Sequence, residues 1–246
     1  MASIKTPKGR LHYKPVNIYL GIKQIDRDIA FENLKAAIRV LREAGIGMSP
    51  ALGTLLGIIR ENNFIEWDED IDFFILSEDK DKLLNALWAM KDEGLELVRE
   101  ARCGHLYSVM RKGEYIDFYI MDSISPELRT GYGDVFMFEK HLTDLMDYDF
   151  RGLTVSVPRQ YEECLDFLYG DWRTPVKYAN FEMSKGAIWK AQLKNNMKKC
   201  LPFGLRFYLL KRHHEKDLYE FLAKCERKGM QLHEDIHYLK TIKMGH

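Results

Sequence analysis

Apolar residues recur at near-helical spacing over residues 25–41, and charged residues separate them. Ile25, Leu34 and Ile38 fall on one side of a helix with this spacing. Gly45 follows at the place where such a helix is expected to end. The pattern therefore predicts an amphipathic helix that packs one face against a core.

Beyond this helix, short apolar runs alternate with further helical patterns. The runs predict strands over residues 46–52, 71–76, 95–99, 106–110 and 115–121. The helical patterns lie at residues 54–62 and 77–91, and a third helix is expected from Pro158 through Leu168. Thr54 is expected to cap the first of these helices and Pro158 to open the last. A loop region with Gly131 and Gly133 precedes Pro158.

From residue 185 onward the chain is expected to be helical, with a break near Pro202 and Gly204. Strands that alternate with helices, followed by a helical C-terminal part, predict an α/β or α+β core. We expect a catalytic domain over residues 1–184 and a helical region over residues 185–246 that packs on it.

Composition excludes several classes of protein. Lysine plus arginine equals aspartate plus glutamate at 37 each, so no global charge indicates a nucleic-acid partner. The four cysteines form no C-x-x-C pair, and neither a zinc site nor a disulfide framework is expected. No apolar run approaches the roughly 20 residues that cross a bilayer. The first ten residues do not resemble a signal peptide, and we expect a cytoplasmic protein.

The most informative chemistry is a pair of acids at the start of a predicted strand. Asp70 and Asp72 are two residues apart, and alternate residues of a strand share a face. Two such carboxylates repel one another unless a cation lies between them. Mg²⁺, or Mn²⁺, takes carboxylate and phosphate oxygens. Asp117, the only acid within residues 115–120, is expected to complete this metal site from a neighbouring strand.

The segment before these acids contains candidate phosphate ligands. The Gly53-Thr54 turn can present backbone N–H groups and a hydroxyl at a helix start, with Gly57 in the same segment. Arg60 follows and is a candidate for a second phosphate. Asp68 is expected to support the site or to form a turn rather than to bind the metal. Taken alone, an acidic cluster is more often a solvated loop, and the neighbouring motifs are what favour a site.

Together these motifs resemble the LicD family, which includes fukutin and the fukutin-related protein. The hallmark G-T-L-L-G-x-x-R segment, a Phe-Ile pair, Trp67 and the acids run in order through residues 53–72. A strand acid like Asp117 follows, and residues 169–172 form a Tyr-Gly-Asp-Trp block similar to that of the family. Two residues depart from the pattern: Glu66 replaces a proline and Glu69 replaces a common aspartate. The resemblance covers about residues 25–180.

The resemblance implies a nucleotidyltransferase fold, with a mixed sheet flanked by helices. It implies transfer of a phospho-alcohol, such as phosphocholine or a polyol phosphate, from a CDP-activated donor to a glycan or lipid-linked glycan, with release of CMP. Bacterial relatives decorate capsule, teichoic acid or lipopolysaccharide. Asp117 is also a candidate general base for the acceptor hydroxyl. Candidate residues lining the donor or acceptor site are Trp67, Asp68, Tyr169, Asp171 and Trp172, and core packing is the alternative for the aromatic rings of Tyr169 and Trp172.

Two other functions use the same residues. The first is a nucleotidyltransferase that attacks the α-phosphorus of a nucleoside triphosphate and releases pyrophosphate. The second is a non-catalytic module that binds a glycan or a nucleotide. The intact acids Asp70, Asp72 and Asp117 argue against this second alternative, and the released product separates the first from CMP release.

The C-terminal region has a local excess of positive charge. Between Lys185 and Arg212 the chain carries eight basic residues and no acid, interleaved with tryptophan, phenylalanine and leucine. This pattern fits a helix lying on the inner, anionic surface of a membrane. The alternative is a helix that packs its apolar side on the core and leaves its lysines in water.

Overall fold

The computed structural model describes residues 1–16, 18, 24–101, 104–133, 135–175, 202–230 and 232. The chain divides into two compact units, residues 1–177 and residues 178–246. The boundary expected at residue 184 lies outside the described residues. The larger unit carries the sheet and all of the predicted acids.

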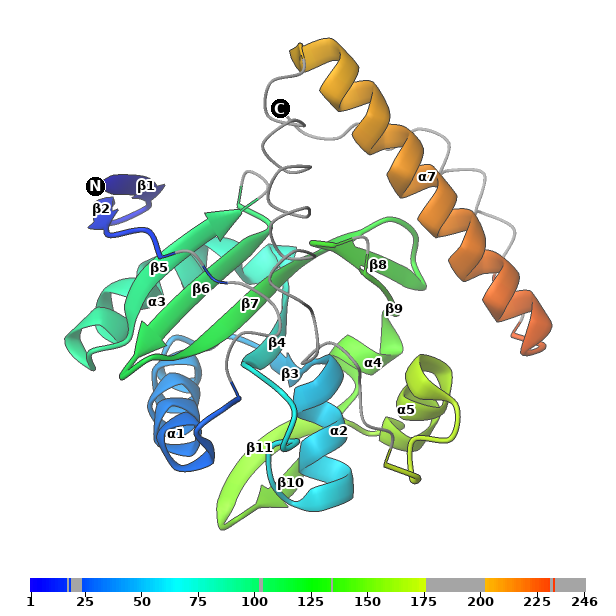
Figure 1. The fold of residues 1–246 in the computed structure, drawn as a ribbon, viewed down its shortest axis with the longest axis horizontal. Helices are drawn as coiled ribbons and strands as arrows, with labels where there is room; N and C mark the ends of the chain where they lie inside the picture. The colour runs from blue at the N-terminus through cyan, green and yellow to red at the C-terminus, as the bar shows by residue number, and fades with distance from the viewer. Residues whose placement is uncertain are drawn as a thin grey trace. The chain divides into compact units, whose positions relative to one another are not determined.

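The centre of this unit is a seven-stranded mixed sheet (Figure 1). Five strands follow the order β3-β4-β7-β6-β5, and β8 and β9 extend it from the end of β7. Only β4 and β7 are parallel, and the other pairs are antiparallel. The strands are β3 (Met48–Pro50), β4 (Ile71–Leu76), β5 (Glu96–Ala101), β6 (Leu106–Arg111), β7 (Glu114–Ser123), β8 (Leu128–Gly131) and β9 (Val135–Phe138). The mixed sheet flanked by helices is the predicted fold class.

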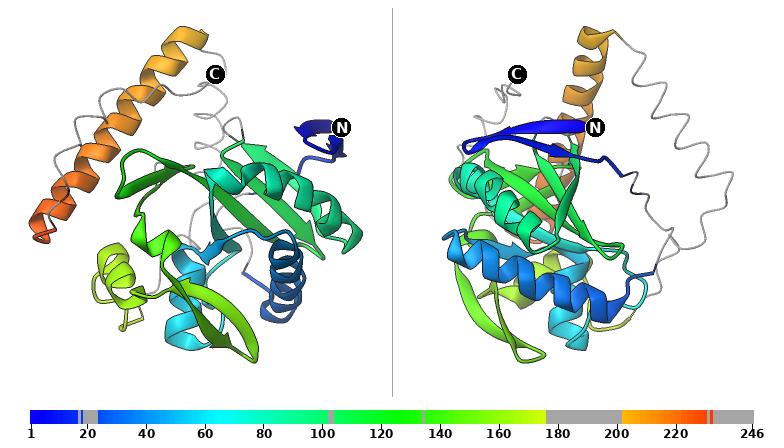
Figure 2. Two further views of the ribbon diagram at one scale, coloured as in Figure 1. Left: turned by 180° about the vertical axis from the view of Figure 1, so that it is seen from behind. Right: turned by 90° about the vertical axis from the view of Figure 1, so that its left-hand side faces the viewer.

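Helix α1 (Arg27–Glu43) confirms the first amphipathic pattern. The Asp26 side chain accepts hydrogen bonds from the backbone N–H groups of residues 28 and 29, which satisfies two donors of the first turn. Its apolar face is buried, with Leu34 and Leu41 fully inaccessible. Helix α3 (Lys80–Asp92) follows the short 3-10 turn η1 (Ser77–Asp79), and α1 and α3 pack together on one side of the sheet (Figure 2).

Several elements escaped prediction because their strands are short and partly polar. The N-terminal residues form a hairpin of β1 (Ala2–Thr6) and β2 (Gly9–Tyr13). The expected loop region contains β8, β9, the short helix α4 (Lys140–Thr143) and a second hairpin of β10 (Leu145–Phe150) and β11 (Leu153–Pro158).

The prediction that Pro158 opens a helix is wrong. Pro158 is the last residue of β11, opposite Leu145, and helix α5 (Tyr161–Tyr169) begins three residues later. β11 is paired in a two-stranded hairpin, so proline, which has no N–H to donate, is tolerated at the end of this strand.

In the second unit the described residues form helix α7 (Phe203–Arg227), which starts directly after Pro202. The expected break near Pro202 therefore corresponds to a helix start. Residues 185–200, which carry the first half of the basic region, lie outside the described residues. Among the described helices, none combines the length and the apolar character that a membrane crossing requires.

Candidate active site

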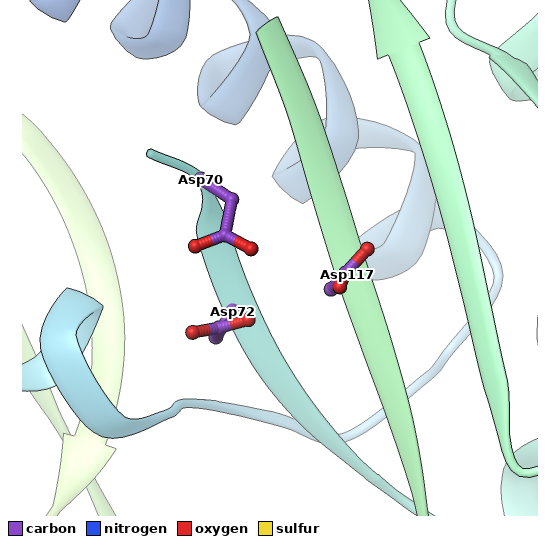
Figure 3. Close-up of side chains that lie close together, drawn as sticks. All are labelled: Asp70, Asp72 and Asp117. Carbon is purple, nitrogen blue, oxygen red and sulfur yellow. The ribbon is translucent and has the colours of Figure 1, made fainter. Parts of the chain in front are cut away.

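The pairing of β4 with β7 brings the three predicted acids together. Asp72 is the second residue of β4 and lies directly opposite Asp117 on the parallel strand β7. Side chains at paired positions project from the same face of a sheet. Asp70 precedes β4 and points to the same place (Figure 3). One carboxylate oxygen from each acid lies within 4.8 Å of the other two.

Two of these carboxylates are buried, and each has one oxygen without a hydrogen-bond partner. Asp72 is 6% and Asp117 2% exposed, and the Oδ1 atom of each is buried with no hydrogen-bond partner. Buried polar atoms in native proteins almost always have a partner, so such a pair requires an explanation. Oxygen ligands that converge from three carboxylates are what Mg²⁺ or Mn²⁺ binds. The residues present therefore fit a divalent cation.

The electrostatics of the cluster agree with this interpretation. Burial, followed by the charges of Asp70 and Asp117, raises the pKa of Asp72 well above its ordinary value. Burial and the charge of Asp117 raise the pKa of Asp70 in the same way. Without a cation, the protein therefore resists carrying all three negative charges at once.

Sequence patterns missed Arg99, on β5. Its Nη2 donates to Oδ2 of Asp117, and its Nε donates to the hydroxyl of Ser108 at 2.8 Å. Burial raises the pKa of Asp117, whereas Arg99 and Ser108 oppose that rise. The sequence did not indicate Arg99 as a site residue. The simple alternation of side chains along a strand would turn Arg99 to the face of the sheet opposite Asp117.

Two tyrosines flank Asp117 on β7 and share its face, as the spacing of Tyr115, Asp117 and Tyr119 alone could have indicated. The Tyr115 hydroxyl donates to the Asp70 carboxylate, and burial and that acid raise the pKa of Tyr115. Tyr119 packs edge-to-face against Phe74 at 5.9 Å between ring centroids. The acids thus lie between aromatic side chains.

Helix α2 (Leu52–Glu61) carries the Gly-Thr turn, but Thr54 does not cap it. The helix begins at Leu52, with Ala51 as its N-cap and no side-chain cap bond. The buried hydroxyl of Thr54 instead accepts a hydrogen bond from the backbone N–H of Asp72 at 2.8 Å. This bond satisfies a buried donor of β4 and fixes the first turn of α2 beside the acids. The capping prediction is therefore wrong.

Asp68 packs against the same turn. A side chain at Gly53 would place its Cβ 2.3 Å from Oδ2 of Asp68, so any other residue there would force the Asp68 side chain to move. Oδ1 of Asp68 accepts from the backbone N–H of Glu69, and burial raises the pKa of Asp68 to about 6. Asp68 thus adjoins the three-acid group without belonging to it.

Gly57 and Arg60 have contacts within the fold. A Cβ on Gly57 would lie 2.6 Å from the carbonyl oxygen of Asn63, so glycine is required for packing. Arg60 donates from Nη1 to the carbonyl oxygen of Trp172 at 3.1 Å and from Nη2 to Glu61. The Nε atom of Arg60 is buried without a hydrogen-bond partner, and phosphate binding by Gly57 and Arg60 stays a prediction.

The other candidate lining residues differ in exposure. Trp172 is 6% exposed and donates from Nε1 to Asp166, with the Arg173 guanidinium 4.2 Å from the centroid of its ring. Tyr169 is half-buried against the core. For these two aromatic residues the structure favours core packing, whereas Trp67 and Asp171 are exposed.

Comparisons with known proteins bear on the same residues. Residues 46–160 match the family model described as LicD/FKTN/FKRP, nucleotidyltransferase domain. This span includes residues 53–72 and Asp117 and ends before Tyr169. A search of curated protein sequences finds no match.

Among solved structures, the chain is similar to the solution structure of the antibiotic-resistance factor ANT(2'')-Ia. The identity is 14% and the TM-score 0.41, over 77% of this chain and 99% of that one. The crystal structure of ANT(2'')-Ia in complex with adenylyl-2''-tobramycin is similar at 13% identity and a TM-score of 0.39, over 78% of this chain and 95% of that one.

Asp72→Asn tests the electrostatic account of the cluster. A carboxyl group whose pKa is raised by folding destabilises the fold increasingly as the pH rises through that pKa. In EDTA, the free energy of unfolding of the variant should therefore rise relative to that of the wild type. This gain should be larger at pH 8 than at pH 4. Its affinity for Mn²⁺ is expected to fall by at least about 100-fold, because even supporting residues of metal sites contribute 10- to 100-fold.

Chemical denaturation at the two pH values and calorimetric titration with Mn²⁺ measure these effects. Asp147→Asn, on the exposed side of β10, is the matched control and should change neither. Wild-type Mn²⁺ affinity in Asp72→Asn would remove Asp72 from the metal site.

Proposed function

Because residues 46–160 match the LicD/FKTN/FKRP nucleotidyltransferase-domain model, we propose that this chain is a metal-dependent phosphotransferase. It transfers a phospho-alcohol group from a CDP-activated donor to the hydroxyl of a glycan and releases CMP. The observation that carries the proposal is the convergence of Asp70, Asp72 and Asp117, with two buried oxygens that lack partners. Family membership suggests a transferase, and the cluster supplies a place for its phosphates.

The chain's own residues have distinct roles in this proposal. Asp70, Asp72 and Asp117 hold Mg²⁺ or Mn²⁺, which when bound neutralises charge on the diphosphate of the donor. The first turn of α2 has free backbone N–H groups, and Gly53 and Thr54 offer them to a phosphate beside the acids. The hydroxyl proton of Thr54 remains available, because its oxygen is the acceptor in the bond from Asp72.

The reaction balances without a covalent enzyme intermediate. The acceptor oxygen forms a bond to the β-phosphorus of the donor while the bond from that phosphorus to the oxygen of CMP breaks. The acceptor proton is released to solvent. Asp117 is a ligand in this proposal, and it is also a candidate base for that proton, because burial raises its pKa although Arg99 and Ser108 oppose the rise.

Product analysis tests this function directly. Purified protein with Mg²⁺ is incubated with CDP-choline, CDP-glycerol or CDP-ribitol and with a teichoic acid or lipopolysaccharide fraction. We expect CMP with one of the donors, an equimolar gain of the head-group phosphate on the glycan, and loss of both products in Asp72→Asn. Pyrophosphate from a nucleoside triphosphate would instead identify a nucleotidyltransferase, and nucleotide binding without any product would identify a binding module.

The second unit supports a further proposed partner, the anionic surface of a membrane that presents a lipid-linked acceptor. The first three turns of α7 carry Lys211 and Arg212 and no acid. Leu205, Tyr208 and Leu209 are each close to half exposed, which is unusual for large apolar side chains. Basic and apolar residues side by side favour attachment to such a surface.

Cosedimentation with vesicles containing phosphatidylglycerol, or phosphatidylcholine alone, tests this contact. We expect binding to the anionic vesicles at low salt that weakens at high salt, because each basic group contributes only about 1 kcal/mol. Lys211→Glu with Arg212→Glu should abolish binding, whereas the charge-matched pair Lys5→Glu with Lys8→Glu, on exposed positions of the first unit, should not. Recovery of the wild-type protein in the supernatant under all conditions would exclude the membrane contact.

A further inference from the structure

We infer that Arg99 tunes the charge of the acid cluster. It bonds one carboxylate oxygen of Asp117 and reduces the negative charge that a cation meets at Asp70, Asp72 and Asp117. This inference rests on the cluster being a cation site, as proposed above. No sequence motif contains Arg99, and the geometry alone points to it.

The first observation is an irregularity in β5. Leu97 pairs with Val109 of β6, but Arg99 pairs with Ser108 instead of Tyr107, so Val98 is an extra residue in the strand. In a regular strand Arg99 would share the face of Leu97, which is 4% exposed against the core. The bulge turns Arg99 to the other face of the sheet, and bulges commonly re-aim side chains in this way near active sites.

The second observation is a continuous row across four strands. Arg99 pairs with Ser108, Ser108 with Asp117, and Asp117 with Asp72. Ser108 is completely buried and accepts the hydrogen bond from Nε of Arg99. This bond holds the guanidinium of Arg99 beside Asp117, and the guanidinium donates to Oδ2 of Asp117. The Oδ1 atom of the same carboxylate is buried without a partner, and one oxygen of Asp117 lies within 4.8 Å of oxygens of Asp70 and Asp72.

The third observation concerns charge. Asp70, Asp72 and Asp117 carry three negative charges when ionised, and Arg99 is the positive group that acts on both Asp72 and Asp117. With Arg99 the four side chains sum to minus two, the charge that a single divalent cation neutralises. Its guanidinium always carries its charge, so the positive contribution to this balance does not depend on pH.

Arg99 therefore affects the cation in a definite direction. Its positive charge repels a metal ion at the neighbouring carboxylates, and its removal should tighten metal binding. Its removal should also leave the metal-free acids without their positive neighbour, which destabilises the metal-free fold. A salt bridge that only supports the fold would produce the second effect without the first.

The test measures Mn²⁺ binding and thermal unfolding of EDTA-treated protein at pH 8, where protons compete least with the metal. Arg99→Met is expected to bind Mn²⁺ about tenfold more tightly than the wild type and to melt at a lower temperature in EDTA. Addition of Mn²⁺ should raise the melting temperature of the variant more than that of the wild type. Arg99→Lys keeps the charge and should restore the wild-type Mn²⁺ affinity. Ser108→Ala keeps Arg99 but removes its anchor, and it should also bind Mn²⁺ as the wild type does.

The outcomes separate the two proposals. Unchanged or weaker Mn²⁺ binding in Arg99→Met, alongside Mn²⁺ binding by the wild type, would overturn the role of Arg99 and leave the metal site in place. A wild type that binds no Mn²⁺ would overturn the metal site itself. If Arg99→Met does not fold, tighter binding in Arg99→Gln supports the inference and wild-type binding in Arg99→Gln overturns it.

Discussion

The repulsion between buried carboxylates at the β4–β7 pair is the constraint on which the rest of this structure depends. Asp72 and Asp117 are paired directly across the two strands, and both are nearly inaccessible. Two ionised groups at the 4.8 Å limit of this cluster repel by about 3 kcal/mol at an effective dielectric constant of about 20. A hydrogen bond to an ionised group contributes about 1.5–3 kcal/mol, but the Oδ1 atoms of Asp72 and Asp117 have no such bond to offset the repulsion. A divalent cation would offset it.

The surrounding elements can be understood as the means of holding this arrangement. The hydroxyl of Thr54 satisfies the backbone N–H of Asp72 and ties α2 to β4. The Tyr115 hydroxyl donates to Asp70, and Arg99 holds the outer oxygen of Asp117. Gly53 leaves room for the Asp68 side chain against the first turn of α2. Each contact orients a group toward one place, as a site that handles phosphate requires.

Much of this site could be predicted from the sequence, because its signals are local. Asp70 and Asp72 have the two-residue spacing of a strand, and Asp117 is isolated in an apolar run, so their convergence followed from alternation. Arg99 could not be predicted, because the bulge at Val98 reverses its direction and a bulge has no signature in this segment. Thr54 resembled a cap by residue type, yet its partner is a backbone group 18 positions away. The hairpins of β1–β2 and β10–β11 were missed because their strands are only five or six residues long and include polar residues.

The most direct test of the account is diffraction from crystals of the wild-type protein soaked in Mn²⁺, recorded at a wavelength where manganese scatters anomalously. The account predicts an anomalous peak at coordination distance, about 2 Å, from one oxygen each of Asp70, Asp72 and Asp117. It also predicts that Arg99 stays bonded to the other oxygen of Asp117. The absence of any peak between these three carboxylates at saturating Mn²⁺ would contradict the account.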